Sequence, residues 1–294
     1  MENIKVVLNW KQKILLNLLT ALDNERCSRL KIFKLSFLLT QKTNFYDFVP
    51  YKYGPYSFEM DKDLRMFNNN GWINMDKNLI YTNYNLIKLL PIEIDHKYEL
   101  HDIINKFSNI NEKNLLDLIY ESYPFYTKNS VLVKEHKSKE QVTPVAIYTI
   151  GYQNLSIDSF ISILIEKNIK TVLDVRNKPF SYKYGFNYSW LKKYLPEFNI
   201  EYINIPELGI EEKYRKTFPR EKLWEYYYAL LDMKKLCLNR VSDSMLRQPS
   251  VIMCYEMFPE DCHRLRLAER IQSLTNLPIV NFNTEKKQWI RLDY

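Results

Sequence analysis

Glycine, cysteine and histidine are scarce in this sequence, which has 5 Gly, 4 Cys and 4 His among 294 residues. So few cysteines, without a regular spacing, do not make the disulfide framework of a small secreted domain. Long apolar runs are also lacking, and none approaches the roughly 18 residues of a membrane span. The first residues, MENIKVVLNWKQK, lack the apolar core of a signal peptide. We therefore expect a cytoplasmic protein with reduced thiols and no membrane partner.

What the sequence does contain is enough apolar material for two cores. Hydrophobic residues make up 46% and charged residues 26% of the chain, which is a globular composition. The length suits two domains better than one. The formal net charge is +7, a mild positive balance that is compatible with phosphate-bearing partners such as DNA. The composition leaves the oligomeric state open.

The first half of the chain has the pattern of a winged helix. Residues 28–41, SRLKIFKLSFLLTQ, predict a buried helix with Ser28 as its N-cap. A second helix is expected over 57–70, and residues 72–82, WINMDKNLIYT, predict a hairpin that turns at MDKN. Helices followed by a two-stranded hairpin are typical of this class of small domain.

Basic side chains gather around the start of the first of these helices, at Arg26, Arg29, Lys31 and Lys34. We interpret them as candidate contacts to the phosphates of nucleic acid. The alternative is a solvated face on a module that binds a protein partner.

The segment KEHKSKEQVTP, residues 134–144, is charged, has no apolar anchors and ends in proline. These features are typical of a linker. It separates an expected winged-helix-like domain, residues 1–133, from an expected α/β domain of catalytic type, residues 145–294.

Beyond the linker, short apolar stretches alternate with stretches of helical pattern. This order indicates a parallel sheet flanked by helices, in a Rossmann-like α/β arrangement. Four strands are expected, over 146–152, 171–176, 200–208 and 250–256, and helices are expected over 156–169, over 220–238 and from Pro259 onward.

Polar residues and glycines follow the expected strands where each one ends. Asp174 and Arg176 close the second strand, Cys254 and Glu256 close the last, and Gly151 follows the first. Ligands of open parallel sheets bind at the carboxyl ends of the strands. The sequence therefore predicts a site at this rim of the sheet.

The second domain resembles the uncharacterised-domain family numbered four hundred and eighty-eight, over residues 147–283. The resemblance lies in YTIGY, LDVRNKPFS, GFN, PELG and CYEMFPEDCHR. The first domain resembles Panacea-type winged-helix antitoxin domains through KLSFLL, residues 34–39, and YKYGPYS, residues 51–57. These resemblances imply a setting in DNA processing or phage defence, and they fix the fold better than the reaction.

Asp174 and Arg176 lie two residues apart and therefore on one face of their strand. One interpretation makes Asp174 a general base, or a carboxylate that faces a cationic transition state, and Arg176 a clamp for an anion. The alternative is a structural ion pair at the end of a strand.

The segment VIMCYEMFPEDCHRLRLAERI, residues 251–271, places Cys254, Cys262 and His263 close together. Zinc could use these three, but the spacing is unusual, and adjacent residues on a helix point about 100° apart. A thiol nucleophile at Cys254 would need a loop of backbone N–H groups, for which the segment lacks glycine. We therefore expect no metal and no other cofactor.

The preferred interpretation uses the helix that starts near Pro259. Its partial positive charge would add to His263 and Arg264 to hold a phosphate, while Glu256 would face the same pocket as Asp174. Cys254 and Cys262 would line this anion site as packing residues.

Further candidates surround this rim. We expect Tyr152 or Phe186 to stack on a base, and Gly151 and Asn187 to approach the ligand. Lys183 belongs to SYKYGFNYSWLKKY, residues 181–194, where basic and aromatic residues alternate as in nucleic-acid-binding segments.

Together these residues predict an enzyme that hydrolyses something at a nucleobase, in the manner of a DNA glycosylase and without a metal. Asp174, Glu256 and His263 would be catalytic, and DNA would be the partner. The alternative is a DNA-binding regulator or toxin–antitoxin component whose α/β domain senses a ligand. The sequence does not name the substrate or the base.

Overall fold

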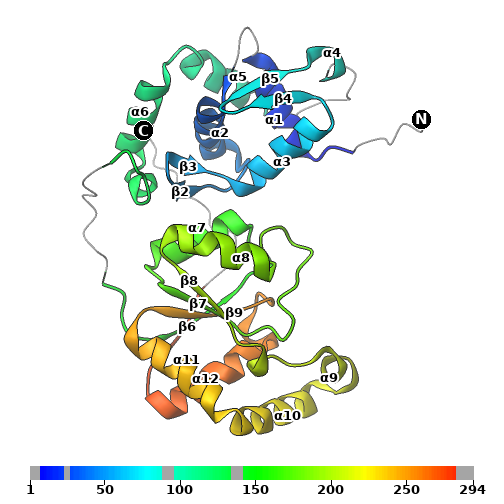
Figure 1. Ribbon diagram of the computed structural model, residues 1–294, viewed down its shortest axis with the longest axis vertical. Coiled ribbons are helices and arrows are strands. Elements are labelled where there is room, and N and C mark those ends of the chain that lie inside the picture. The colour runs from blue at the N-terminus through cyan, green and yellow to red at the C-terminus, as the bar shows by residue number, and fades with distance from the viewer. Residues whose placement is uncertain (1–6, 23–26, 88–95, 134–141, 283–294) are drawn as a thin grey trace. The chain divides into compact units, whose positions relative to one another are not determined.

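The computed structural model describes residues 7–22, 27–87, 96–133 and 142–282. The chain divides into two compact units, Met1–Lys137 and Ser138–Tyr294 (Figure 1). Most of the expected linker, residues 134–144, lies outside the described residues. In the described ranges, no helix combines the length and the apolar character needed to cross a bilayer.

The first unit packs helices with two small antiparallel sheets, one of which contains the hairpin expected over 72–82. Ser28 and Ser57 cap two of the helices, because each hydroxyl accepts the N–H three residues on. The helices are α1 Trp10–Ala21, α2 Arg29–Thr43, α3 Phe58–Asn69, α4 Tyr84–Ile87, α5 Lys97–Phe107 and α6 Glu112–Ser122. The strands are β1 Cys27–Ser28, β4 Ile73–Asp76 and β5 Leu79–Thr82 in one sheet, and β2 Val49–Tyr51 and β3 Gly54–Tyr56 in another.

In the described part of the chain, two of the basic residues expected to meet nucleic acid, Arg29 and Lys34, are engaged by other groups of the unit. The guanidinium of Arg29 pairs with the buried carboxylate of Asp61. Lys34 is 2% exposed and its Nζ donates a hydrogen bond to the carbonyl of Pro55 at 3.0 Å. Lys31 is half-buried, and Arg26 lies outside the described residues. The inward turn of Lys34 is a correction to its prediction as a phosphate contact.

Burial lowers the pKa of Lys34 to about 7. The unfolded chain therefore binds a proton between pH 7 and 10.5 that the folded chain does not. Raising the pH through this window stabilises the unit, by at most about 1.4 kcal/mol per pH unit. We expect urea unfolding from pH 7 to 9 to show this slope in the native protein and in Lys31→Met, and to lose it in Lys34→Met. An unchanged slope in Lys34→Met would show that other groups cause it.

The second unit is built on a sheet of five parallel strands in the order β10-β6-β9-β7-β8. The strands are β6 Ile147–Gly151, β7 Thr171–Asp174, β8 Glu201–Asn204, β9 Ser250–Cys254 and β10 Ile279–Asn281. The helices are α7 Ile157–Glu166, α8 Tyr188–Tyr194, α9 Glu212–Thr217, α10 Arg220–Met233, α11 Lys235–Arg247 and α12 His263–Thr275. Helices α7 and α8 lie on one face of the sheet and α10 to α12 on the other (Figure 1), which confirms the predicted α/β class.

Two details of the second unit differ from the prediction. The helix expected over 220–238 is two helices, because the backbone of Lys234 leaves the helical region between them. The edge strand β10 was not expected, since it has three residues and an exposed pattern. The break at Lys234 carries neither proline nor glycine, the residues that mark such boundaries in a sequence.

Candidate functional site

The carboxyl ends of three neighbouring strands meet at one rim of the sheet, as expected. Gly151 at the end of β6 is in register with Cys254 at the end of β9. Asp174 at the end of β7 lies opposite Met253 on one side and Asn204 on the other. Because all the strands are parallel, the segments that follow them share this rim.

A pocket of about 480 Å³ opens at this rim, which is a usual size for a small-molecule site. Four basic residues and one acidic residue contribute to its wall. Three aromatic rings of the wall are exposed: Phe180 at 63%, Tyr182 at 99% and Tyr255 at 44%. The wall residues are Tyr152, Arg176, Asn177, Lys178, Phe180, Ser181, Tyr182, Lys183, Ile210, Glu212, Arg215, Cys254 and Tyr255.

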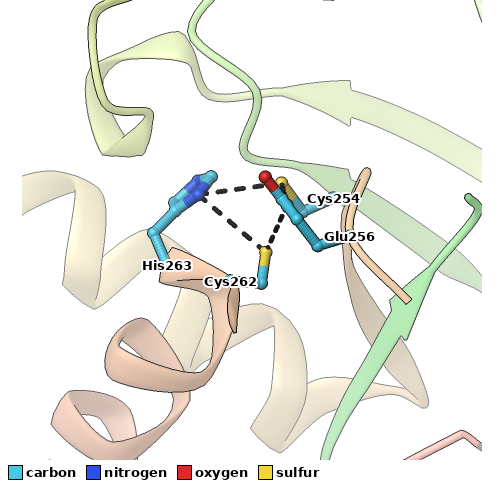
Figure 2. Close-up of side chains that lie close together, drawn as sticks. All are labelled: Cys254, Glu256, Cys262 and His263. Carbon is cyan, nitrogen blue, oxygen red and sulfur yellow. Dashed lines mark hydrogen bonds between the residues drawn. The ribbon is translucent and has the colours of Figure 1, made fainter. Parts of the chain in front are cut away.

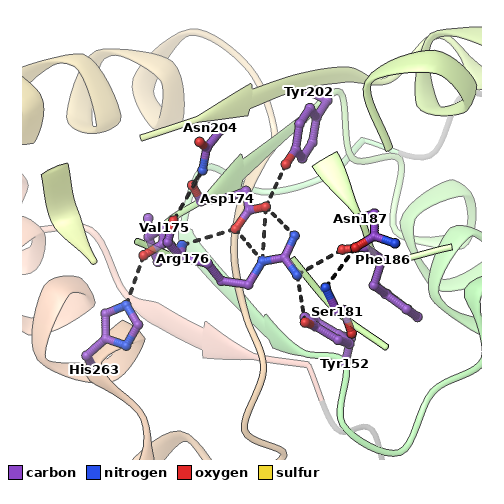
Figure 3. A network of polar contacts seen from close by, with 10 residues as sticks. All are labelled: Tyr152, Asp174, Val175, Arg176, Ser181, Phe186, Asn187, Tyr202, Asn204 and His263. Carbon is purple, nitrogen blue, oxygen red and sulfur yellow. Dashed lines mark hydrogen bonds and ion pairs between the residues drawn. The ribbon is translucent and has the colours of Figure 1, made fainter. Parts of the chain in front are cut away.

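Asp174 and Arg176 form a buried ion pair behind the pocket (Figure 3). Arg176 Nη2 lies 2.6 Å from Asp174 Oδ2, and its Nε donates to Oδ1 at 2.8 Å. The hydroxyl of Tyr202 donates to Oδ2 at 2.6 Å. On its other side, Arg176 Nη1 donates to the hydroxyl of Tyr152 at 2.6 Å and to the carbonyl of Phe186 at 2.9 Å. Both oxygens of Asp174 are therefore occupied.

This network favours the structural alternative for Asp174. Burial opposes the charge on Arg176, but the hydrogen bonds and charge of Asp174 outweigh it and raise the arginine pKa. Burial and the neighbouring Asp174 raise the pKa of Tyr202. Asp174 thus holds Arg176 in place and has no oxygen directed at the pocket, which corrects its prediction as a general base.

The aromatic pair expected to receive a base is closed. Tyr152 stacks on Phe186 with ring centroids 4.1 Å apart, and the guanidinium of Arg176 lies 5.1 Å from the Tyr152 centroid. Phe186 is fully buried. Asn187 caps α8 by position, while its side chain accepts the N–H of Ser181 at 2.8 Å. These residues shape the pocket wall, and the exposed rings are the ones that a base can reach.

Lys183 lines the pocket and also holds its wall together. Its Nζ donates to the carbonyl of Gln153 at 2.6 Å and to that of Tyr152 at 3.3 Å. The ammonium group therefore ties the 181–187 loop to the end of β6. It keeps its place among the predicted ligand contacts because it lines the pocket.

Beside the pocket, Cys254, Glu256, Cys262 and His263 bring four side chains together (Figure 2). Glu256 Oε2 lies 2.8 Å from Cys262 Sγ and 3.3 Å from Cys254 Sγ. His263 Nδ1 lies 3.7 Å from Cys254 Sγ and 4.0 Å from Cys262 Sγ. One potential ligand atom from each residue falls within 4.8 Å of the others.

The convergence depends on where α12 begins. Residues Pro259–Asp261 form a short 3-10 turn, Cys262 is extended at φ −118° and ψ 141°, and the helix starts at His263. This corrects the predicted helix start at Pro259. Because Cys262 precedes the helix, its side chain is not separated from that of His263 by the helical angle. The geometric objection to a shared metal site is therefore wrong.

Arg264 does not face an anion site. It is 1% exposed, and it donates to the carbonyl of Glu256, to the carbonyl of Met257 at 2.8 Å and to Thr149 Oγ1 at 3.3 Å. Its role is to hold the loop that carries Glu256, so the prediction of Arg264 as a phosphate contact is corrected.

Gly151 is required by the close approach of this loop. A Cβ at this position would lie 1.8 Å from the carbonyl oxygen of Glu256. We expect Gly151→Ala to displace the loop and to destabilise the unit by about 1–3 kcal/mol, measured by urea unfolding. Lys170→Ala, an exposed position before the other end of β7, should change stability by less than about 0.5 kcal/mol. Equal stability of the two variants would contradict the close approach.

Arg215 links the pocket to the cluster. This pocket residue comes from α9 and places Nη1 3.3 Å from Glu256 Oε1 and Nη2 3.3 Å from His263 Nδ1. The sequence does not distinguish Arg215 from the other cations of the basic segment KYRKTFPREK, residues 213–222. The basic composition of this segment is the only sequence feature that points to a cation here, and it does not show which side chain turns toward the cluster.

Glu256 and Cys262 have pKa values that are shifted in opposite directions. Burial opposes ionisation of Glu256, but the hydrogen bond from Cys262 and the charge of Arg215 outweigh it and lower its pKa. Burial raises the pKa of Cys262 well above the usual value of a thiol. Glu256 is therefore an anion at neutral pH, with 24% of its side chain exposed.

Residues 156–271 match the family model described as Domain of unknown function DUF488. The match confirms the resemblance seen in the motifs of the second domain, and it includes β7, β9, α9 and the start of α12. The search of curated proteins and the search of solved structures gave no match.

Proposed function

We propose that the second unit is a hydrolase that acts at the nucleobase of DNA or of a nucleotide. The observation that carries the proposal is the rim pocket, where basic side chains and exposed rings lie beside an ionised, partly exposed carboxylate. Glu256 is the general base in this proposal. Its oxygens are held by Arg215 of the pocket wall and by two thiols, but its side chain is 24% exposed, whereas that of Asp174 is 0% exposed.

The wall of the pocket suits a ligand with a phosphate and a base. Lys178, Lys183 and Arg215 supply cations, and phosphate oxygens accept charge-assisted hydrogen bonds from such groups. Phe180, Tyr182 and Tyr255 present exposed rings, and a base stacked on a ring gains about 1–3 kcal/mol. A base in duplex DNA would have to be extruded to reach them.

The chemistry that fits these groups is hydrolysis of an N-glycosidic bond. Water attacks the sugar carbon, Glu256 takes a proton from the water, and the bond to the base nitrogen breaks. The base leaves with the bonding electron pair, and the charge of Arg215 stabilises it until solvent protonates it. Such a reaction belongs to DNA processing or defence, with DNA as partner in the cytoplasm.

The proposal is tested by looking for the product. The full chain would be incubated with unmodified DNA, base-modified DNA and free nucleotides. Mass spectrometry would detect released bases, and an aldehyde-reactive probe would count abasic sites. Released base and abasic sites in equal amounts would support the proposal. Tight binding without any product would favour a ligand-sensing regulator instead.

A further inference from the structure

We infer that Cys254, Glu256, Cys262 and His263 form a zinc site. The inference concerns the cluster alone and does not depend on the substrate of the pocket. Two thiols, one imidazole nitrogen and one carboxylate oxygen are a usual ligand set for zinc. Three of the four residues are buried, and Glu256 is partly exposed.

Two of the four separations between ligand atoms fit a tetrahedral ion, and the other two lie near its range. Zinc bonds of about 2.3 Å to sulfur and about 2.0 Å to nitrogen or oxygen place neighbouring ligands roughly 3.3–3.8 Å apart. The two sulfur–nitrogen distances here are 3.7 and 4.0 Å, and the two sulfur–oxygen distances are 3.3 and 2.8 Å. The side chains need only small rotations to surround the metal (Figure 2).

The imidazole of His263 is oriented by a hydrogen bond to a backbone carbonyl, as in many metal-bound histidines. Its Nε2 lies 3.0 Å from the carbonyl oxygen of Val175, which only accepts hydrogen bonds (Figure 3). Nε2 therefore carries the hydrogen, and the lone pair of Nδ1 faces the two thiols and Arg215 Nη2, which lies 3.3 Å away and would give up this contact when zinc binds. A backbone carbonyl on the far nitrogen is the usual means of orienting a metal-bound histidine.

The charge of the site is balanced by a residue already in place. One Zn²⁺ with two thiolates and one carboxylate carries a net charge of −1, and Arg215 lies 3.3 Å from Glu256 Oε1. Glu256 is also the one ligand that is partly exposed, and its Oε1 has Arg215 as a partner outside the cluster. It can leave the metal for Arg215 and give its position to water, which keeps it available as the proposed base.

The ligand types favour zinc over Mg²⁺ and Ca²⁺. Thiolate and imidazole are poor ligands for Mg²⁺ and Ca²⁺, which take oxygen, and they suit zinc in a four-coordinate site. The segment that supplies them lies inside the region that matches the family model.

The test is the metal content of the full chain. Protein purified without chelator, incubated with ZnCl₂ and dialysed is expected to hold about one zinc ion per chain. Cys262→Ser and His263→Ala should each hold less than about one tenth of this amount. Cys237→Ser is the matched control, because Cys237 is a free cysteine outside the cluster, and it should keep the full amount.

A second measurement uses only the native protein, so it does not depend on the folding of the variants. Protein loaded with Co²⁺ in place of zinc should show the intense visible bands of a tetrahedral ion and a thiolate-to-cobalt charge-transfer band. Less than about one tenth of an equivalent of zinc in the native protein, or a weak octahedral cobalt spectrum, would overturn the inference. In that case the four groups are a hydrogen-bonded cluster without metal. Base release in the absence of zinc would leave the proposed hydrolase standing, so the two proposals fail separately.

Discussion

Arg176→Met is expected to lower the free energy of unfolding of the second unit by about 3–5 kcal/mol. The substitution removes the cation from a carboxylate that is 0% exposed. Asp174 would keep the hydroxyl of Tyr202 as a partner but would lose the three side-chain contacts of Arg176. A buried carboxylate without its counter-ion is costly, because its charge is taken out of water with nothing to balance it.

The effect is measured by urea unfolding, followed by a probe in the second unit. The double variant Asp174→Asn/Arg176→Met removes both charges and should recover at least about half of the lost stability. Lys178→Met changes an exposed cation of the same pocket and should cost less than about 0.5 kcal/mol. If Arg176→Met and Lys178→Met unfold alike, the ion pair does not hold the rim together.

Glu256→Gln is expected to lower the rate of base release by about 10²–10⁴-fold. The glutamine side chain has nearly the same shape, so it preserves the packing, but it cannot take a proton from water. Ligand binding should change by less than about tenfold, a difference of 1.4 kcal/mol, because the phosphate contacts come from other residues. The measurement is the release of base under single-turnover conditions, together with the dissociation constant of the ligand.

Glu260→Gln is the matched control for this prediction. Glu260 is an exposed carboxylate four residues further along, and its backbone carbonyl rather than its side chain accepts the bond from Arg220. It should release base at the native rate. Equal activity of Glu256→Gln and the native protein would remove Glu256 from the mechanism. Loss of activity in Glu260→Gln would show that charge near the rim matters more than the position of the carboxylate.

The sequence was a good guide to the frame of the site. Short apolar strands followed by polar residues predicted that Gly151, Asp174 and Cys254 would meet at one rim, and their register confirms it. This works because parallel strands place their carboxyl ends on one edge whatever the details of packing. The Ser28 cap was predicted correctly as well, since a cap depends on only four neighbouring residues.

The roles of individual side chains at the rim were harder to predict. Asp174 and Arg176 have the same sequence pattern whether they face a ligand or each other, and only the position of Tyr202 and Tyr152 around them decides. The direction of Cys262 depends on one extended residue before α12. The sequence placed that residue inside the helix because Pro259 fits a first turn.

The position of Arg215 also could not be predicted from the sequence. It lies about forty residues before Glu256, in a segment with several cations of similar pattern. Which of these cations reaches the cluster depends on how α9 packs beside α10. At this contact the ring centroids of Tyr214 and Tyr226 lie 4.3 Å apart. A contact that depends on packing between two helices leaves no periodic signal in the sequence.

The measurement that tests the central claim most directly is a mass balance on the DNA or nucleotide that binds best. Native protein in excess would be mixed with it, and released base, abasic product and intact ligand would be quantified over time. We expect released base and abasic product to rise together while intact ligand falls by the same amount. Ligand that remains intact while fully bound to the pocket would contradict the account, and would make the second unit a sensor rather than an enzyme.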